Sequence, residues 1–561
     1  MRTASKTPLT ATAKSWWTDS LFILAVGFIF FFAFLGDRPL FTPDEGRYAE
    51  IAREMVTRND YVTPYLNGIK YFEKPAFFYW LGVIAIKLGV VNIWAVRSIN
   101  ALIGLVGLLI TYLATRKLFD RLTGLLAASI LGTSMLYFVM SHMVSLDLPV
   151  TVFLSACLYS FIIGTREASL SKSCAYFYTS AFFAGLAVLT KGLIGIVFPI
   201  IIIGAWILTT NRFGTLKKFP FIGAIILFLF VTVPWHWLVA TRNPEFFYFY
   251  FIEQHFLRYT TLDIGHYQPA WYFFPVLLAG FFPWIVFLPQ AFLQSVKHIF
   301  QKQDKDGISL YFLLWAALVF TFFSFSKSKL IPYILPTIPP LAILSADYLA
   351  KHLRKSRKIT GLLISELILL CSSAVISFYL IQFARTSALP DALSAKLYLT
   401  SASIVLIAGV SSSIIMLFRN KHFSIFTLTI STAIFLILSM ASIRAIDTRT
   451  VLPLAIKIKS LAKPGDEVIS YNQYYQDLPF YLQKRITILN WRNEMSYGMK
   501  YQDTHDWMIN DDTFWRRWHS QKRLFVIMGL EEFKQFQKKY SGVKWYIIAK
   551  TENNILISNH P

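Results

Sequence analysis

The apolar residues of this chain gather in long uncharged runs over its first 440 positions. Runs of roughly 17 to 25 apolar residues are long enough to cross about 30 Å of hydrocarbon as α-helices. Such runs occur at 20–36, 97–115, 122–140, 148–164, 175–190, 192–210, 219–238, 271–293, 309–325, 331–350, 359–383, 397–418 and 423–442. The pattern therefore predicts a polytopic α-helical membrane protein with about 13 transmembrane helices. We expect the first run to be a retained signal-anchor helix, because no small-residue cleavage site follows it.

One further apolar stretch, 76–92, carries Lys87 in its middle. Counting it as a span would invert every later loop. Aromatic and basic side chains such as Tyr79, Trp80 and Lys87 are typical of helices that lie in the membrane interface. We therefore favour a helix lying flat at the outer surface over a true span.

The pattern changes at about Ser442, where the chain becomes as polar as a soluble protein. Short apolar segments bounded by turn residues predict strands, and longer amphipathic ones predict helices. The expected strands lie in 465–473, 485–490, 523–529, 545–551 and 554–559, and the expected helices in 477–484 and 530–540. We predict two domains: a transmembrane domain, 1–442, which includes a catalytic first outer loop at 37–96, and a small α/β domain, 443–561.

Charge supports this topology. Only 15% of residues are charged, against about one quarter in soluble proteins, and the formal net charge is +23. The lysines and arginines of the membrane region fall mainly in alternate short loops, which the positive-inside rule places in the cytoplasm. The positive charge thus indicates topology and contact with anionic lipid, not nucleic-acid binding. An odd number of spans then puts the 443–561 domain outside. The three cysteines, in or beside apolar runs, predict no disulfide.

The first outer loop opens with TPDEGRYAEIAREM from Thr42. Thr42 with Glu45 three residues on predicts a capping box, with Pro43 at the first helical position. A long extramembrane loop of this kind is usually functional. We interpret Asp44, at the tip of the helix, as a functional group. We interpret the later charges, at positions 50, 53 and 54, as solvated.

Other charged residues lie in the remaining outer loops. Lys74 of YFEKP suits either a phosphate contact or an interfacial anchor. Lys191 of TKG is interpreted as an outer interfacial anchor in preference to a cavity residue. The rest are His142, Asp147, Glu253, His255, Arg258, Asp263, His266, Lys327, Lys329 and Tyr333. Together they predict an outer cavity for a substrate with a phosphate head and a hydrocarbon tail, the head being clamped by Lys74 and Arg258.

Several motifs, in order along nearly the whole chain, resemble one family. They are TPDEGRYAEIAREM, YFEKP, TKG, WYFFPVLLAGFFPW, FSFSKSKLIPYILP and NEMSYGM. They resemble the bacterial aminoarabinose transferases of lipid A, within the protein O-mannosyltransferase-like GT-C membrane glycosyltransferases. In this chain Ile331 stands between Leu330 and Pro332, so the contacts around that motif are carried over only for Lys329 and Tyr333.

The resemblance implies transfer of 4-amino-4-deoxy-L-arabinose from an undecaprenyl-phosphate carrier to a lipid A phosphate. It implies a multi-pass protein of the Gram-negative inner membrane, with its active site facing the periplasm, that confers resistance to polymyxin and cationic peptides. The implied catalytic residues are Asp44, Glu45, Arg47 and Asp147. The implied substrate-binding residues are Lys74, Arg258, Lys329, Tyr333 and Glu494.

The same resemblance implies no required cofactor, with a zinc ion at Glu73 and His255 as an open option. The implied partners of the chain are the carrier-linked aminosugar, lipid A and membrane lipids, and we expect the protein to be a monomer. Because the leaving group is a phosphate monoester, a one-step displacement would invert the sugar carbon. We expect Asp44 to orient substrate more than to act as a general base, since a phosphate acceptor with a second pKa of about 6 needs little activation.

Two alternatives remain. A related transferase could use another carrier-linked sugar, such as galactosamine, or another acceptor. A lipid-linked sugar transporter would instead place its binding groups near the bilayer midplane, within an inverted repeat. The charged groups here collect in outer loops and no repeat is visible, which favours an enzyme.

Overall fold

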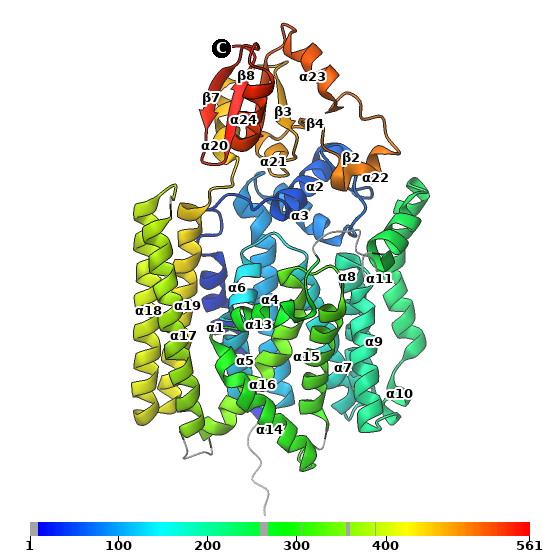
Figure 1. Cartoon of the computed structure of the whole chain (residues 1–561). Coiled ribbons are helices and arrows are strands. Elements are labelled where there is room, and N and C mark those ends of the chain that lie inside the picture. Colours follow the sequence, from blue (N-terminus) through cyan, green and yellow to red (C-terminus); the bar gives the residue numbers. More distant parts are fainter. Residues whose placement is uncertain (1–8, 258–266, 305, 355–358, 388) are drawn as a thin grey trace, which may run out of the picture.

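The computed structural model describes residues 9–257, 267–304, 306–354, 359–387 and 389–561, without the side chains of 9–15, 255 and 256. A bundle of long helices carries a smaller α/β domain at one end (Figure 1). Within the described residues, nine helices are long and apolar enough to span a membrane, or eleven if two bent pairs each count as one span. The chain is therefore a multi-pass membrane protein, as predicted.

The nine are α4 (Ile93–Leu118), α7 (Asp147–Arg166), α8 (Leu170–Lys191), α11 (Phe221–Arg242), α15 (Ile308–Phe325), η4 with α16 (Ile331–Thr337 and Ile338–Arg354), α17 (Thr360–Thr386), α18 (Ala392–Arg419) and α19 (Lys421–Ile446). The bent pairs are α5 (Arg121–Gly132) with α6 (Met135–Ser141), and η2 and α13 (Ala270–Tyr272, Phe273–Gly280) with η3 and α14 (Trp284–Phe287, Leu288–Phe300). The predicted runs 20–36 and 192–210 correspond to α1 (Leu9–Phe32) and α9 (Ile194–Thr210), whose apolar parts are shorter. That the chain has thirteen transmembrane helices stays a prediction.

The two bent pairs support each other at their breaks. The first bends by 67° and the second by 105°. At the breaks, the amide of Met135 donates to the carbonyl of Phe282 at 3.2 Å, and Trp284 Nε1 donates to Thr133 Oγ1 at 2.9 Å. Backbone groups freed inside a membrane must find such partners, because no water is there to replace them.

The first outer loop lies between the bundle and the small domain (Figure 1). It contains α2 (Asp44–Arg58), a hairpin of β1 (Tyr65–Leu66) and β2 (Ile69–Lys70), and α3 (Phe77–Leu88). The hairpin turns at Asn67 and Gly68, which both have positive φ, as a tight two-residue turn requires. At 12 residues α3 is too short for a span, in agreement with leaving 76–92 out of the predicted spans; that the helix lies flat at the outer surface stays a prediction.

The small domain contains a six-stranded sheet in the order β5-β4-β3-β6-β8-β7. The strands β5, β4, β3 and β6 are parallel, and β8 is antiparallel to both β6 and β7. The strands are β3 (Glu467–Tyr471), β4 (Thr487–Leu489), β5 (Met508–Ile509), β6 (Leu524–Gly529), β7 (Tyr546–Lys550) and β8 (Asn554–Ser558). The helices are α20 (Leu452–Leu461), α21 (Leu478–Leu482), η5 (Asn493–Met495), α22 (Ser496–Met499), α23 (Asp511–Trp518) and α24 (Leu530–Lys539). All five predicted strands and both predicted helices are present.

The outer loop and the small domain share one apolar core. Ile51 and Met55 of α2 and Tyr79 of α3 are buried with Leu478 and Phe480 of α21. Gly46 permits a close approach: a Cβ there would lie 2.5 Å from the backbone nitrogen of Asp477. The small α/β domain, from here on called the soluble domain, is therefore packed directly on α2, which carries the predicted catalytic residue Asp44.

Candidate active site

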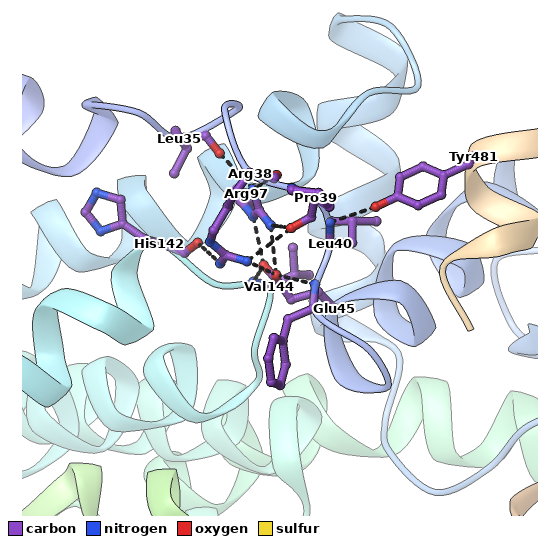
Figure 2. A network of polar contacts seen from close by, with 10 residues as sticks. Leu35, Arg38, Pro39, Leu40, Glu45, Arg97, His142, Val144 and Tyr481 are labelled. Carbon is purple, nitrogen blue, oxygen red and sulfur yellow. Dashed lines mark hydrogen bonds and ion pairs between the residues drawn. The ribbon is translucent and has the colours of Figure 1, made fainter. Parts of the chain in front are cut away.

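The start of α2 is fixed by a buried carboxylate, that of Glu45 (Figure 2). Arg38 Nη1 lies 2.6 Å from its Oε2, and Arg97 approaches both oxygens at 2.8 Å. The amides of Phe41 and Val144 donate to the same carboxylate at 2.8 and 2.9 Å. Burial raises the pKa of Glu45, but the two arginines outweigh burial and bring it down to about 2. We call Arg38, Glu45 and Arg97 the arginine clamp.

The clamp corrects the prediction of a capping box. Pro43 is the residue before the helix, and no side chain caps its first amides. Glu45 turns instead toward Arg38 and Arg97, because two guanidinium groups bind a carboxylate more strongly than one backbone amide does. With both oxygens already engaged, Glu45 holds the loop in place and we assign it no part in the reaction. Arg38 and Arg97 were not singled out from the sequence, although each stands where an arginine adjoins an apolar run.

Asp44 and Arg47, one turn apart on α2, face the soluble domain. The side chain of Asp44 is half exposed, and its Oδ1 lies 3.6 Å from Arg47 Nη1. Arg47 Nη2 lies 2.6 Å from Glu494 Oε2 on η5, and Gln476 Nε2 donates to the other oxygen of Glu494 at 3.0 Å. Burial raises the pKa of Glu494, opposed by the charge of Arg47. The structure thus brings Asp44, Arg47 and Glu494 together, as the predicted site requires.

Asp147, the first residue of α7, has Lys191 as its partner. Lys191 Nζ forms an ion pair with Asp147 Oδ1 and lies 4.6 Å from the ring centroid of Tyr333. The ammonium group of Lys191 is therefore turned into the protein, toward Asp147 and Tyr333, which corrects the interpretation of this lysine as an interfacial anchor. Tyr48 of α2 lies near both acids: burial and then the charges of Asp44 and Asp147 raise its pKa.

The structure describes the side chains of some of the remaining predicted residues and not of others. Lys74 Nζ donates to the carbonyl of Glu73 at 3.0 Å, and the charge of Glu73 contributes to raising the pKa of Glu494. Lys329 is buried and donates to the carbonyls of Gln268 and Ser326. Burial and the nearby Lys327 lower its pKa. Lys329 is thus already held by backbone carbonyls.

Arg258, Asp263 and His266 lie outside the described residues, as does the side chain of His255. The clamp of Lys74 and Arg258 on a carrier phosphate therefore stays a prediction. In the described part of the chain, His, Cys, Asp and Glu form no group of three that could hold a metal. The zinc option at Glu73 and His255 likewise stays a prediction.

The later charges of α2 are buried, so their interpretation as solvated groups is wrong. Arg53 binds both oxygens of Glu50 at 2.7 Å. Glu54 accepts from the amide of Gly68 at 2.8 Å and from Arg58 Nε at 2.9 Å. The soluble domain and the hairpin cover this face of α2, and internal pairing replaces the water that the charges lose.

Both the sequence and the fold of the chain match known proteins. Residues 20–250 match the family model of dolichyl-phosphate-mannose-protein mannosyltransferases, and residues 454–559 match that of the aminoarabinose transferase C-terminal domain. The chain is 29% identical over 537 residues to the undecaprenyl phosphate-alpha-4-amino-4-deoxy-L-arabinose arabinosyl transferase of Erwinia tasmaniensis, covering 91% of this chain and 95% of that protein. It is 34% identical to the protein of the same name from Aeromonas hydrophila, over 60% of this chain and 61% of that one.

The fold is also that of a solved structure. The crystal structure of ArnT from Cupriavidus metallidurans bound to undecaprenyl phosphate superposes with a TM-score of 0.83 at 26% identity, over 98% of each chain. The helical bundle, the acidic outer loop and the mannosyltransferase match define a membrane glycosyltransferase of the GT-C class. With the C-terminal match and the full-length relative, the chain belongs to the aminoarabinose transferase family.

Replacing Glu45 by glutamine tests the arginine clamp. The variant leaves Arg38 and Arg97 buried without a counter-charge, so we expect about 3–5 kcal/mol less stability, measured by thermal unfolding in detergent. The folded-state pKa of about 2 lies below the ordinary value of 4.5, so the stabilisation is complete above pH 4.5 and is lost between pH 4.5 and 2.

Glu45→Gln should lack this acid-dependent component. Glu531→Gln, at an exposed site on α24, is the control and should unfold like the wild type. An unchanged unfolding temperature for Glu45→Gln would show that the clamp is not structural.

Proposed function

We propose that the chain transfers 4-amino-4-deoxy-L-arabinose from undecaprenyl phosphate to a phosphate group of lipid A, and so lowers the negative charge to which polymyxin and cationic peptides bind. The observation that carries the proposal is the completion of the acidic loop by the aminoarabinose-type C-terminal domain, through Arg47 and Glu494. A transporter has no need of a soluble domain that places a carboxylate, that of Glu494, beside Arg47 in the first outer loop.

The proposed location is the inner membrane of a Gram-negative bacterium, with the site in the periplasm. The site and the soluble domain occupy one end of the bundle, and α10 (Gly214–Lys218), with Lys217 and Lys218, lies at the other (Figure 1). Basic loops mark the cytoplasmic side. The active site then faces outward, where carrier-linked sugar and lipid A share the outer leaflet.

In the proposed reaction the acceptor phosphate attacks the anomeric carbon of the sugar, and the bond to the carrier phosphate breaks in the same step. The attack from the opposite face inverts that carbon. Lys74 and Arg258 would stabilise the charge that grows on the leaving phosphate. The half-exposed Asp44, held beside Arg47, orients the donor by binding the ammonium group of the aminosugar.

A transfer assay with purified protein tests the proposal. In detergent, without nucleotide or ion gradient, the chain should convert lipid A in the presence of undecaprenyl-phosphate aminoarabinose, and mass spectrometry should detect the addition of one pentosamine. Undecaprenyl-phosphate galactosamine is the matched donor, and should give no product. A hexosamine product would reassign the donor, and no product with either sugar would contradict the transferase proposal.

The role of Asp44 is tested with Asp44→Asn. Loss of a charge-assisted contact to the sugar ammonium should lower kcat/KM by roughly 10- to 100-fold. Because the carboxylate orients substrate, the remaining activity should keep the pH profile of the wild type. Glu531→Gln serves again as control. A wild-type rate would remove Asp44 from the mechanism, and the loss of one limb of the pH profile would identify it as a general base instead.

A further inference from the structure

A groove of about 310 Å³ lies where the helical bundle meets the soluble domain. The bundle contributes Gly36, which follows α1, and residues 91–94 at the start of α4. The soluble domain contributes one face of α20, with Ile456 and Lys459, and part of α21, with Tyr481. Its described lining residues include none of the predicted site residues. We call it the junction groove.

The position of Trp94 places the junction groove at the surface of the membrane. Trp94 is the second residue of α4, one of the helices long and apolar enough to span a bilayer, and tryptophan is enriched where spans meet the lipid headgroups. Its ring centroid lies 5.7 Å from that of Phe32, and a Cβ added at Gly36 would lie 3.3 Å from Trp94 Cβ. The indole is thus a fixed wall of the groove, although 49% of the residue stays exposed.

Exposed apolar side chains surround this part of the molecule. Leu88 and Val90, just before the lining residue Val91, are 85% and 69% exposed, and Ile456 on the opposite wall is 59% exposed. Apolar surface of this kind marks contact with a membrane or with another protein. Because α4 enters the membrane here, acyl chains of the surrounding lipids would cover these side chains.

The polar groups of the junction groove suit a phosphate. Among the described lining residues Lys459 alone is charged, and within the described part of the chain it forms no ion pair. An ammonium group binds phosphate as a point charge. Asn92 Oδ1 accepts from the amide of Ala95 at 2.7 Å, which leaves the Nδ2 of Asn92 to donate to a phosphate oxygen.

Charge also narrows the class of lipid. A headgroup with its own ammonium, as in phosphatidylethanolamine, would bring a second positive charge to Lys459, and no carboxylate is among the described lining residues to offset it. In phosphatidylglycerol the phosphate is the sole charge. Its hydroxyls can also form hydrogen bonds with side-chain amides such as that of Gln483.

We propose that the junction groove binds one anionic phospholipid of the surrounding membrane, with the phosphate at Lys459 and the acyl chains along Trp94 and Ile456. The proposal goes beyond the proposed function, because the lipid is neither donor nor acceptor of the sugar.

The bound lipid would stabilise the contact between the two domains, because each domain supplies one wall of the groove. Tyr481 links this wall to the active-site loop: its hydroxyl accepts from the amide of Leu40 at 2.7 Å. Leu40 is two residues from Arg38 of the arginine clamp. A lipid that holds α21 against the bundle therefore supports the segment that fixes the start of α2.

The test is lipid binding to the full chain in detergent, followed by thermal unfolding and by native mass spectrometry. Phosphatidylglycerol should raise the unfolding temperature and remain bound as one molecule, whereas phosphatidylethanolamine should do neither. Lys459→Gln should weaken phosphatidylglycerol binding about 10-fold, as expected for one lost charged contact. Lys457→Gln is the matched control, since it removes an exposed lysine from the same helix outside the groove, and should bind like the wild type.

A second variant tests the apolar wall. Ile456→Ser should weaken binding about 5-fold through lost acyl-chain contact, without changing the unfolding temperature in the absence of lipid. Equal losses for Lys459→Gln and Lys457→Gln, or equal binding of the two phospholipids, would overturn the proposal. Displacement of phosphatidylglycerol by equimolar undecaprenyl phosphate or lipid A would also overturn it, by giving the groove to a substrate. None of these measurements needs sugar transfer, so a failure of the proposed function would leave their outcome unchanged.

Discussion

The structure of the outer loop depends on one buried charge. Glu45 is removed from water, and a carboxylate in such a place is tolerated only where opposite charge and hydrogen bonds replace its hydration. Arg38, from the segment after α1, and Arg97, from α4, supply both. The clamp thereby joins α4 and the segment after α1 to the first turn of α2. It fixes the direction in which Asp44 and Arg47 point before any substrate arrives.

From that fixed start, α2 serves as the base on which the soluble domain packs. Its buried face meets α21 at Gly46, and its later charges are paired inside the interface. The domain then returns Glu494 to Arg47 and so contributes to the acidic site itself. A domain attached only by a linker could not hold a carboxylate within hydrogen-bond distance of a membrane-proximal arginine. The shared core explains how it does so here.

The sequence could predict those parts of the fold that depend on local pattern. Apolar runs located the long helices, and short apolar segments located β3, β4, β6, β7 and β8. The strand β5 was missed because two residues carry no periodicity. The order of motifs predicted the family, which the full-length relative and the solved structure confirm.

The partners of the site residues could not be predicted, because they are distant in sequence. Glu45 and Arg97 are 52 positions apart, and Asp147 and Lys191 are 44 apart. The local sequence pattern predicted a capping box for Glu45, but its carboxylate forms long-range ion pairs instead. The same holds for Lys191: a lysine between two apolar runs favours an interfacial anchor until the fold places Asp147 beside it.

The interpretation that the bundle and the soluble domain form one active site depends on the ion pair between Arg47 and Glu494. A double-mutant cycle on kcat/KM for aminoarabinose transfer, with Arg47→Met and Glu494→Gln, tests it most directly. If the two residues act as a pair, each single variant should lose about 100-fold in kcat/KM, and the double variant should lose no more than the worse of the two. Losses that multiply to about 10⁴-fold in the double variant would show that the two residues act independently, and that the soluble domain does not complete the site through this ion pair.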